Sequence, residues 1–327
     1  MSLFAKLHTE NRLPYFDGAT GWLNSEPLNA DCLRGNVVLV DFWTYTCINW
    51  LRTLGYVRAW HDKYEGQGLV VVGVHTPEFP FERDTDNVRW AATRQRVEYP
   101  IALDPEYAVW RAFSNNYWPA VYIADAEGTI RHMHFGEGGY EECEMVIQML
   151  LREAGHDRVA DDLVSVTGEG FEAQADWGTL ASPETYLGYG QGRNFVSTDT
   201  ATFNEPREFD LRERLERNHW GLSGNWTLGP GKSVANDADG RLAFRFHARD
   251  VNLVMSPPAS GPVAYRVLID GEPPRDARGL DVDESGNGTL DRPRLHQLIR
   301  EPRSIADRTV EITYLAPGVE IYCITFG

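Results

Sequence analysis

Two apolar runs separated by a helical pattern constrain the fold of this 327-residue chain more than any other feature. The runs are VVLVDFW at 37–43 and LVVVGVH at 69–75, and such β-branched stretches are typical of strands buried on both faces. From Cys47 to Tyr64, apolar residues recur at helical spacing. Strand, helix and strand with short connections predict a βαβ unit with parallel strands and a right-handed crossover.

The sequence up to residue 155 continues this unit with further helices and a strand hairpin. The order of the βαβ unit, a hairpin around Glu127-Gly128 and a closing helix is that of a thioredoxin-like sheet, with an extra segment around 77–103. We therefore predict a thioredoxin-like α/β domain over residues 12–155. The additional patterns indicate helices at 84–96, 105–113 and 141–154 and strands at 120–124 and 129–135.

The second half of the chain has a different pattern. Residues 156–182 lose periodicity and are rich in Asp, Glu and Gly, which indicates a linker. From residue 183 onward, short alternating runs are separated by Gly, Pro and Asp, which predicts an all-β sandwich, jelly-roll-like, over 183–327. The runs lie at 241–247, 251–255, 263–269, 309–315 and 319–326.

The charge and hydropathy of the chain argue against a nucleic-acid partner and against a transmembrane segment. It has 31 Lys and Arg against 48 Asp and Glu, a formal net charge of −17, so we expect no nucleic-acid partner. We expect no transmembrane segment either, because no stretch approaches the roughly 18 consecutive apolar residues that a membrane helix needs.

One of the four cysteines, Cys47, occupies a position that favours reactivity. It follows a buried strand and begins a helix, where backbone amides and the helix dipole stabilise a thiolate. The alternative is an inert, buried cysteine. The other three, Cys32, Cys143 and Cys323, form no Cys-x-x-Cys pair with it, and we expect Cys32 and Cys143 to be ordinary thiols.

Several blocks of sequence together resemble a known family. VVLVDFWTYTCINWLRTLGYVRAW, VVVGVHTPEFPFE, YPIALD, YWPAVYIAD and RHMHFGEGGY resemble the thioredoxin-like part of DipZ-type thiol:disulfide interchange proteins. They are more distantly similar to the TlpA/ResA group of thioredoxin-fold reductases. The later blocks SPETYLGYG, GNW and FHARDVNLV are similar to the carbohydrate-binding-module-like β-sandwich that follows in DipZ proteins.

The resemblance implies an active site around Cys47, but the redox motif of the family is altered. Where the family has Cys-x-x-Cys, this chain has Cys47-Ile-Asn-Trp50, and Trp50 cannot resolve a mixed disulfide. Pro119, after Trp118, matches the cis-proline that holds an incoming chain beside the cysteine. Glu78 matches an acid that could transfer protons, although it also fits a solvated loop glutamate.

These residues predict a thiol–disulfide oxidoreductase that uses Cys47 as a single nucleophile. The exchange partner would be a disulfide-containing protein or a low-molecular-weight thiol, and an external thiol, or Cys32 or Cys143 if close, would release the product. A redox-inactive binding or scaffold protein is the first alternative. The second is a thiol peroxidase, because Thr44-x-x-Cys47 resembles the peroxiredoxin motif, although Val40 and Trp118-Pro119 depart from it.

Other motifs are weaker, and we expect neither a metal nor another cofactor. His132-x-His134 lacks a third ligand nearby, and the calcium-like loop from Asp281 ends at Arg292 where a glutamate is required. Four aromatic residues could line a glycan site or a protein-docking surface on the sandwich, although most aromatic residues of this kind belong to cores. They are Tyr189, Trp220, Trp226 and Tyr265.

We expect a cytoplasmic location. The first eight residues contain too short an apolar run for a signal peptide. A single thiolate can be regenerated by the glutathione pool in a reducing compartment, whereas in an oxidising one it would remain trapped as a mixed disulfide. A leader trimmed from the sequence would instead place the protein in the periplasm.

Overall fold

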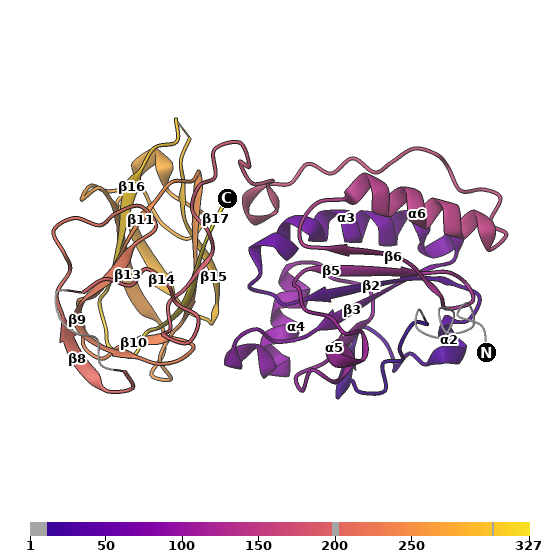
Figure 1. The fold of residues 1–327 in the computed structure, drawn as a ribbon, viewed down its shortest axis with the longest axis horizontal. Helices are drawn as coiled ribbons and strands as arrows, with labels where there is room; N and C mark the ends of the chain where they lie inside the picture. Colours follow the sequence, from indigo (N-terminus) through magenta and orange to yellow (C-terminus); the bar gives the residue numbers. More distant parts are fainter. Residues whose placement is uncertain (1–11, 198–202, 303) are drawn as a thin grey trace, which may run out of the picture. The chain divides into compact units, whose positions relative to one another are not determined.

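The computed structural model describes residues 12–197, 203–302 and 304–327 (Figure 1). It divides the chain into two compact units, Met1–Ala173 and Gln174–Gly327. In the part of the chain that the model describes, no helix combines the length and apolar character that crossing a bilayer requires.

The first unit is built on a sheet with the strand order β1-β4-β3-β2-β5-β6. β2 pairs in parallel with β3, and β3 with β4, whereas β1, β5 and β6 are antiparallel to their neighbours. This is the predicted thioredoxin-like sheet. Its strands are β1 (Gly21–Leu23), β2 (Val37–Trp43), β3 (Leu69–His75), β4 (Ile101–Leu103), β5 (Ala120–Ala124) and β6 (Ile130–Phe135).

The predicted βαβ unit forms from β2, the long helix α3 (Ile48–Tyr64) and β3. Every residue of β2 is buried, which explains why its sequence is continuously apolar except at Asp41. In Figure 1, α3 and α6 lie side by side over one face of the sheet. Side chains of α2 and α5 pack against the opposite face. The remaining α-helices among the described residues of this unit are α2 (Ala30–Leu33), α4 (Thr85–Arg94), α5 (Ala108–Ala112) and α6 (Tyr140–Glu153).

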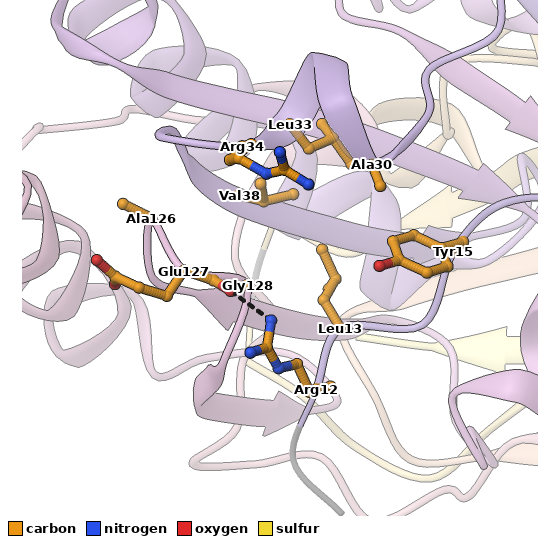
Figure 2. Close-up of a pocket in the computed structure, with 10 residues that line it drawn as sticks. All are labelled: Arg12, Leu13, Tyr15, Ala30, Leu33, Arg34, Val38, Ala126, Glu127 and Gly128. Carbon is orange, nitrogen blue, oxygen red and sulfur yellow. Dashed lines mark hydrogen bonds between the residues drawn. The ribbon is translucent and has the colours of Figure 1, made fainter. Parts of the chain in front are cut away.

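A small pocket of about 80 Å³ marks the end of the sheet at which β2 begins (Figure 2). Leu13, Leu33 and Val38 form its apolar lining, and the Arg12 guanidinium donates a hydrogen bond to the carbonyl of Glu127 over 2.9 Å. The residues that follow β2 and β3 are therefore at the other end of the sheet.

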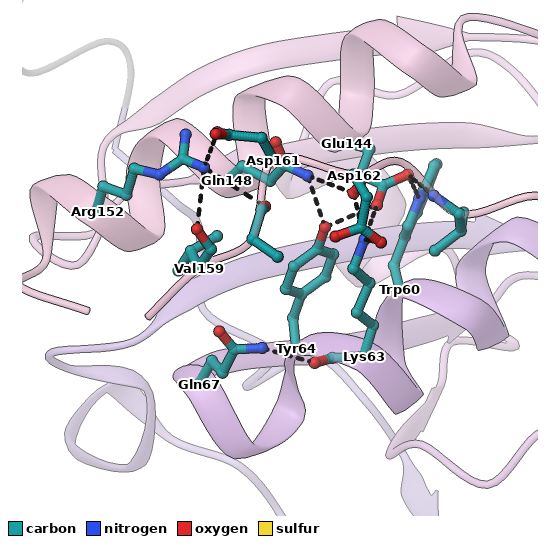
Figure 3. A network of polar contacts seen from close by, with 12 residues as sticks. Trp60, Lys63, Tyr64, Gln67, Glu144, Gln148, Arg152, Val159, Asp161 and Asp162 are labelled. Carbon is teal, nitrogen blue, oxygen red and sulfur yellow. Dashed lines mark hydrogen bonds and ion pairs between the residues drawn. The ribbon is translucent and has the colours of Figure 1, made fainter. Parts of the chain in front are cut away.

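The segment 156–173, part of the region predicted to be a linker, is fastened to α3 and α6 and belongs to the first unit. The buried carboxylate of Glu144 accepts hydrogen bonds from Trp60, Lys63 and Tyr64 of α3 and from the amide of Val164 (Figure 3). Polar contacts therefore hold much of this segment in place, and its last residues form the 3-10 helix η3 (Gly170–Glu172).

The second unit is a large antiparallel sheet that folds around one apolar core, which confirms the predicted all-β class. Its continuous path is β14-β13-β16-β11-β9-β10-β17-β12-β15. β9 pairs with β11 through its first residues and with β8 and β10 through its later ones. The positive φ of +89° at Gly224, which a glycine adopts readily, lies between these two halves.

The strands of the second unit include all five runs that the sequence indicated. They are β7 (Thr185–Tyr186), β8 (Pro206–Phe209), β9 (Trp220–Leu228), β10 (Ser233–Ala235), β11 (Gly240–Phe246), β12 (Asp250–Ser256), β13 (Val263–Ile269), β14 (Asn287–Leu290), β15 (Arg294–Arg300), β16 (Arg308–Tyr314) and β17 (Glu320–Phe326).

The proposed aromatic platform for a glycan does not form. Trp220, Trp226 and Tyr265 are buried in the core of this unit, and of the four candidates Tyr189 alone is exposed. Aromatic rings supply large apolar areas to cores, and that role accounts for these three. They are not available to stack on a sugar.

Candidate active site

Cys47 lies four residues beyond β2 and is the N-cap of α3. Its N–H donates to the carbonyl of Thr44 over 3.2 Å, and its own carbonyl accepts from Leu51 over 3.0 Å. The half-buried side chain therefore sits before the first turn of a 17-residue helix, where unpaired amides and the helix dipole favour a thiolate.

The Trp118–Pro119 segment lies beside Cys47. Its peptide bond is cis, as the resemblance implies, and the carbonyl oxygen of Trp118 lies 3.8 Å from Cys47 Sγ. The Trp118 indole donates to the carbonyl of Thr76 over 3.1 Å, and the Pro119 carbonyl accepts from Gly136 over 2.8 Å. The segment is thus held from both sides next to the sulfur.

Trp50 points into the core of the unit. Its ring is fully buried and stacks on Trp43 with centroids 4.3 Å apart, and its Nε1 donates to Oδ2 of Asp41 over 2.9 Å. The position that carries the second cysteine in Cys-x-x-Cys proteins is here filled by an aromatic side chain that also donates a hydrogen bond to one oxygen of a buried acid.

Asp41 is a functional candidate that the sequence analysis missed. Burial raises its pKa to about 7, against the opposing effect of hydrogen bonds from Trp50 and Tyr99. Tyr99 lies 3.3 Å from the same carboxylate oxygen. The available signal was a charged residue inside the apolar run VVLVDFW, since buried charges need specific partners.

The buried carboxyl group in contact with the segment before Cys47 belongs to Glu82, four residues after the predicted Glu78. Glu82 Oε1 accepts a hydrogen bond of 2.7 Å from Thr46 Oγ, and burial raises its pKa. Glu78 is half-buried and donates its backbone N–H to Glu82 Oε2 over 2.7 Å. Both glutamates lie in the segment after β3, but the contact of Glu82 with Thr46 could not be read from the sequence.

Thr44, the threonine of the peroxiredoxin-like motif, is fully buried at the end of β2. Its carbonyl accepts the Cys47 N–H, so it shapes the turn into α3. Among the described residues, no three His, Cys, Asp or Glu side chains are grouped so as to hold a metal ion.

Cys32 lies at the opposite end of β2 from Cys47, and the two remaining cysteines are buried. Cys32 is exposed on α2, before β2, whereas Cys47 follows that seven-residue strand, which spans roughly 20 Å. A disulfide needs Cα atoms within about 7 Å, so Cys32 cannot resolve Cys47 in this fold. Cys143 is buried against His132 of β6, 3.6 Å from its Nε2, and Cys323 is buried in the second unit.

Two family models match this chain. One, described as the AhpC/TSA family, covers residues 11–133, and the other, described as a thioredoxin like C-terminal domain, covers residues 182–327. The matched regions fall in the first and second units, respectively.

Curated relatives match in two ways. The DipZ proteins of Mycobacterium tuberculosis and Mycobacterium bovis are 35% identical over 99% of this chain, which spans 44% of their length. The thiol-disulfide oxidoreductase YkuV of Bacillus subtilis is 30% identical over 43% of this chain and 95% of its own length. A solution structure of a thioredoxin-like protein in the oxidized form is 30% identical, covering 44% of this chain and 96% of that one, with a TM-score of 0.41.

The fold of the first unit, with a cysteine at the start of α3 and a cis-proline beside it, is that of a thioredoxin-like protein. The chain belongs to the thioredoxin-like thiol:disulfide interchange family. Within that family, 99% of this chain is homologous to a part of DipZ.

Proposed function

We propose that this protein is a thiol–disulfide oxidoreductase that works through Cys47 alone. The observation that carries the proposal is the placement of Cys47 Sγ at the start of α3, 3.8 Å from the carbonyl of Trp118 beside cis-Pro119. The buried ring of Trp50 supports the single-cysteine form, because no sulfur is available at the resolving position.

The reaction is two successive thiol–disulfide exchanges. The Cys47 thiolate attacks one sulfur of a substrate disulfide, forms a mixed disulfide with it and releases the other sulfur as a thiolate, which takes up a proton. An external thiolate then attacks the substrate sulfur of the mixed disulfide, forms a new disulfide and returns Cys47 as a thiolate. Electrons balance because one disulfide is consumed and one is formed.

The partner classes follow from this chemistry. A disulfide-containing protein or a small disulfide supplies the first sulfur, and a low-molecular-weight thiol such as glutathione supplies the second. Backbone groups next to Pro119 would hold an extended substrate chain beside Cys47, in the way the family resemblance implies.

The decisive experiment compares the wild type with Cys47→Ser in a glutathione-coupled mixed-disulfide assay. We expect the serine variant to lose the activity completely, while the control Cys32→Ser retains it because Cys32 lies at the far end of β2. Equal rates for the wild type and Cys47→Ser would refute the proposal, and slow alkylation of Cys47 would favour the redox-inactive scaffold.

A thiol peroxidase is the second candidate, because the AhpC/TSA family model matches residues 11–133 and Thr44-x-x-Cys47 lies within them. The two activities separate experimentally. Peroxide consumption that depends on Cys47, with no exchange of a disulfide substrate, would favour the peroxidase.

We also propose a reducing, cytoplasmic setting, since a single cysteine needs an external thiol pool to be released from each mixed disulfide. Fractionation of the native organism tests this directly. Recovery of the mature protein outside the cytoplasm would contradict it.

A further inference from the structure

The loop that follows β3 touches both sides of the candidate site. Thr76, directly after β3, donates its N–H to the carbonyl of Trp43 over 3.0 Å and accepts the Trp118 indole N–H on its own carbonyl over 3.1 Å. At the other end of the loop, Glu82 accepts the hydroxyl of Thr46 over 2.7 Å. This loop therefore connects the segment that leads into Cys47 with the segment that ends at Pro119.

The Glu82 carboxylate joins the loop to the segment before Cys47 by hydrogen bonds to both. The side chain is buried, and its two oxygens serve different partners. Oε2 accepts the backbone N–H groups of Glu78 and Phe79 over 2.7 and 2.8 Å, which fixes the shape of the loop. Oε1 accepts from Thr46, the residue immediately before the nucleophile. Three donors thus stabilise one carboxylate in a site that excludes water.

We propose that Glu82 is a positioning residue for Cys47, acting through Thr46 and the loop 76–82. The inference rests on the proposed function, because it assigns Glu82 a part in the same exchange reaction. With the Thr46 side chain held, the backbone entering α3 has little freedom to rotate. The Cys47 sulfur then stays at the helix start and beside the Trp118 carbonyl, where a thiolate is stabilised and a substrate disulfide would lie.

The first test removes the hydrogen bond between Thr46 and Glu82 while Glu82 itself is kept. In a Cys32→Ser background, Thr46→Val keeps the side-chain shape but loses the hydroxyl, and Thr46→Ser keeps the hydroxyl. The measurement is the rate of Cys47 alkylation by iodoacetamide across pH. We expect Thr46→Val to react about threefold more slowly at pH 7, within the range expected for losing one hydrogen bond, and Thr46→Ser to match the parent.

The pH profile separates positioning from a purely structural role. We expect the midpoint of alkylation in Thr46→Val to rise by about half a pH unit, because a displaced sulfur moves away from the positive end of the helix dipole. A role confined to stability would lower the melting temperature and leave the midpoint unchanged. A parental rate and midpoint for Thr46→Val would overturn the inference.

A second variant, Glu82→Gln, tests whether the charge itself matters, and it stands alone should Thr46→Val fail to fold. The amide oxygen can still accept the two loop N–H groups, and the Thr46 hydroxyl can rotate to accept from the new amide NH₂ group. Positioning therefore predicts a midpoint close to that of the parent. A clear fall in the midpoint, as expected when a nearby negative charge is removed from a thiolate, would overturn it.

The inference and the proposed function fail in different ways. Exchange that persists in Cys47→Ser would remove the proposed function. If exchange requires Cys47 while Thr46→Val keeps the parental pH profile, the function stands and the role of Glu82 does not.

Discussion

Trp50 donates its indole N–H to Asp41 over 2.9 Å, and both side chains are inaccessible to solvent. Trp50 belongs to the first turn of α3 and Asp41 to the central strand β2, so this hydrogen bond ties the helix start to the sheet beneath it. The residue that stands in place of the second cysteine of the family motif is therefore a hydrogen-bond donor to the buried acid.

We expect the stability of the protein to depend on pH through Asp41. Its pKa is raised to about 7 in the folded state, so between roughly pH 4 and 7 the folded protein binds the proton that the unfolded chain releases, and stability falls as pH rises. Asp41→Asn removes this dependence. The difference in the free energy of unfolding between Asp41→Asn and the wild type should therefore grow, in favour of the variant, by roughly 2–4 kcal/mol from pH 5 to pH 8.

Urea unfolding of both proteins at pH 5, 6, 7 and 8 provides the measurement. His75, whose pKa burial lowers to about 3, titrates in both proteins and cancels in the difference. A difference between the two proteins that stays constant with pH would show that Asp41 does not titrate in this window.

Trp50→Cys should create a dithiol centre at a cost in stability. The new thiol lies at i+3 from Cys47 at a helix start, so oxidation should give an intramolecular disulfide and reductase activity that the wild type lacks. Loss of the buried ring should lower the free energy of unfolding by roughly 3–5 kcal/mol. Mass spectrometry of the oxidised variant and thermal unfolding measure the two effects.

Trp177→Cys is the matched control, because Trp177 is 60% exposed and its removal leaves no cavity. It should unfold as the wild type does. Absence of an intramolecular disulfide in oxidised Trp50→Cys would mean that the helix start does not present the two positions together.

The local part of the fold was predictable because its signals are contiguous. The βαβ unit follows from two apolar runs and a helical period, and each element is confirmed. The pairing of β1 with β4 was missed, because two three-residue strands nearly 80 positions apart carry no local pattern.

For the site, residue type and position placed Cys47 at the helix start, whereas the cis bond before Pro119 followed from the family resemblance. The sequence did not indicate Asp41 or Glu82. Their environment is created by Trp50, Tyr99 and Thr46, which are close in space and belong to other elements. Burial of a carboxylate depends on such tertiary partners, which one sequence does not reveal.

Glu144 should hold the segment 159–164 against the helices of the first unit. Its carboxylate accepts from three side chains of α3 and from the Val164 amide, so Glu144→Ala leaves buried donors unpaired and should cost roughly 3–5 kcal/mol of unfolding free energy (Figure 3). Amide hydrogen exchange within 159–164 should become faster than in the wild type, and by a larger factor than exchange in the sheet. The exposed Glu141 of the same helix is the control, and equal exchange in Glu141→Ala and Glu144→Ala would contradict this role.

Thiol labelling should distinguish the four cysteines by their surroundings. At pH 7.5, iodoacetamide should modify Cys47 and the exposed Cys32, while Cys143 and Cys323 stay unmodified until the protein unfolds. Cys143 is shielded twice, because it is 1% exposed and burial raises its pKa to about 12. Mass spectrometry of tryptic peptides gives the extent of modification at each site.

Cysteine substitution tests whether Cys32 or Cys143 attacks the mixed disulfide formed at Cys47. The double variant Cys32→Ser/Cys143→Ser should retain wild-type exchange with glutathione, because Cys32 lies at the far end of β2 and Cys143 is a buried, protonated thiol at neutral pH. Cys47→Ser, assayed beside it, should be inactive. Loss of exchange in the double variant, with its melting temperature unchanged, would mean that one of these two thiols reaches Cys47 during the reaction. It would replace the external thiol with an internal one.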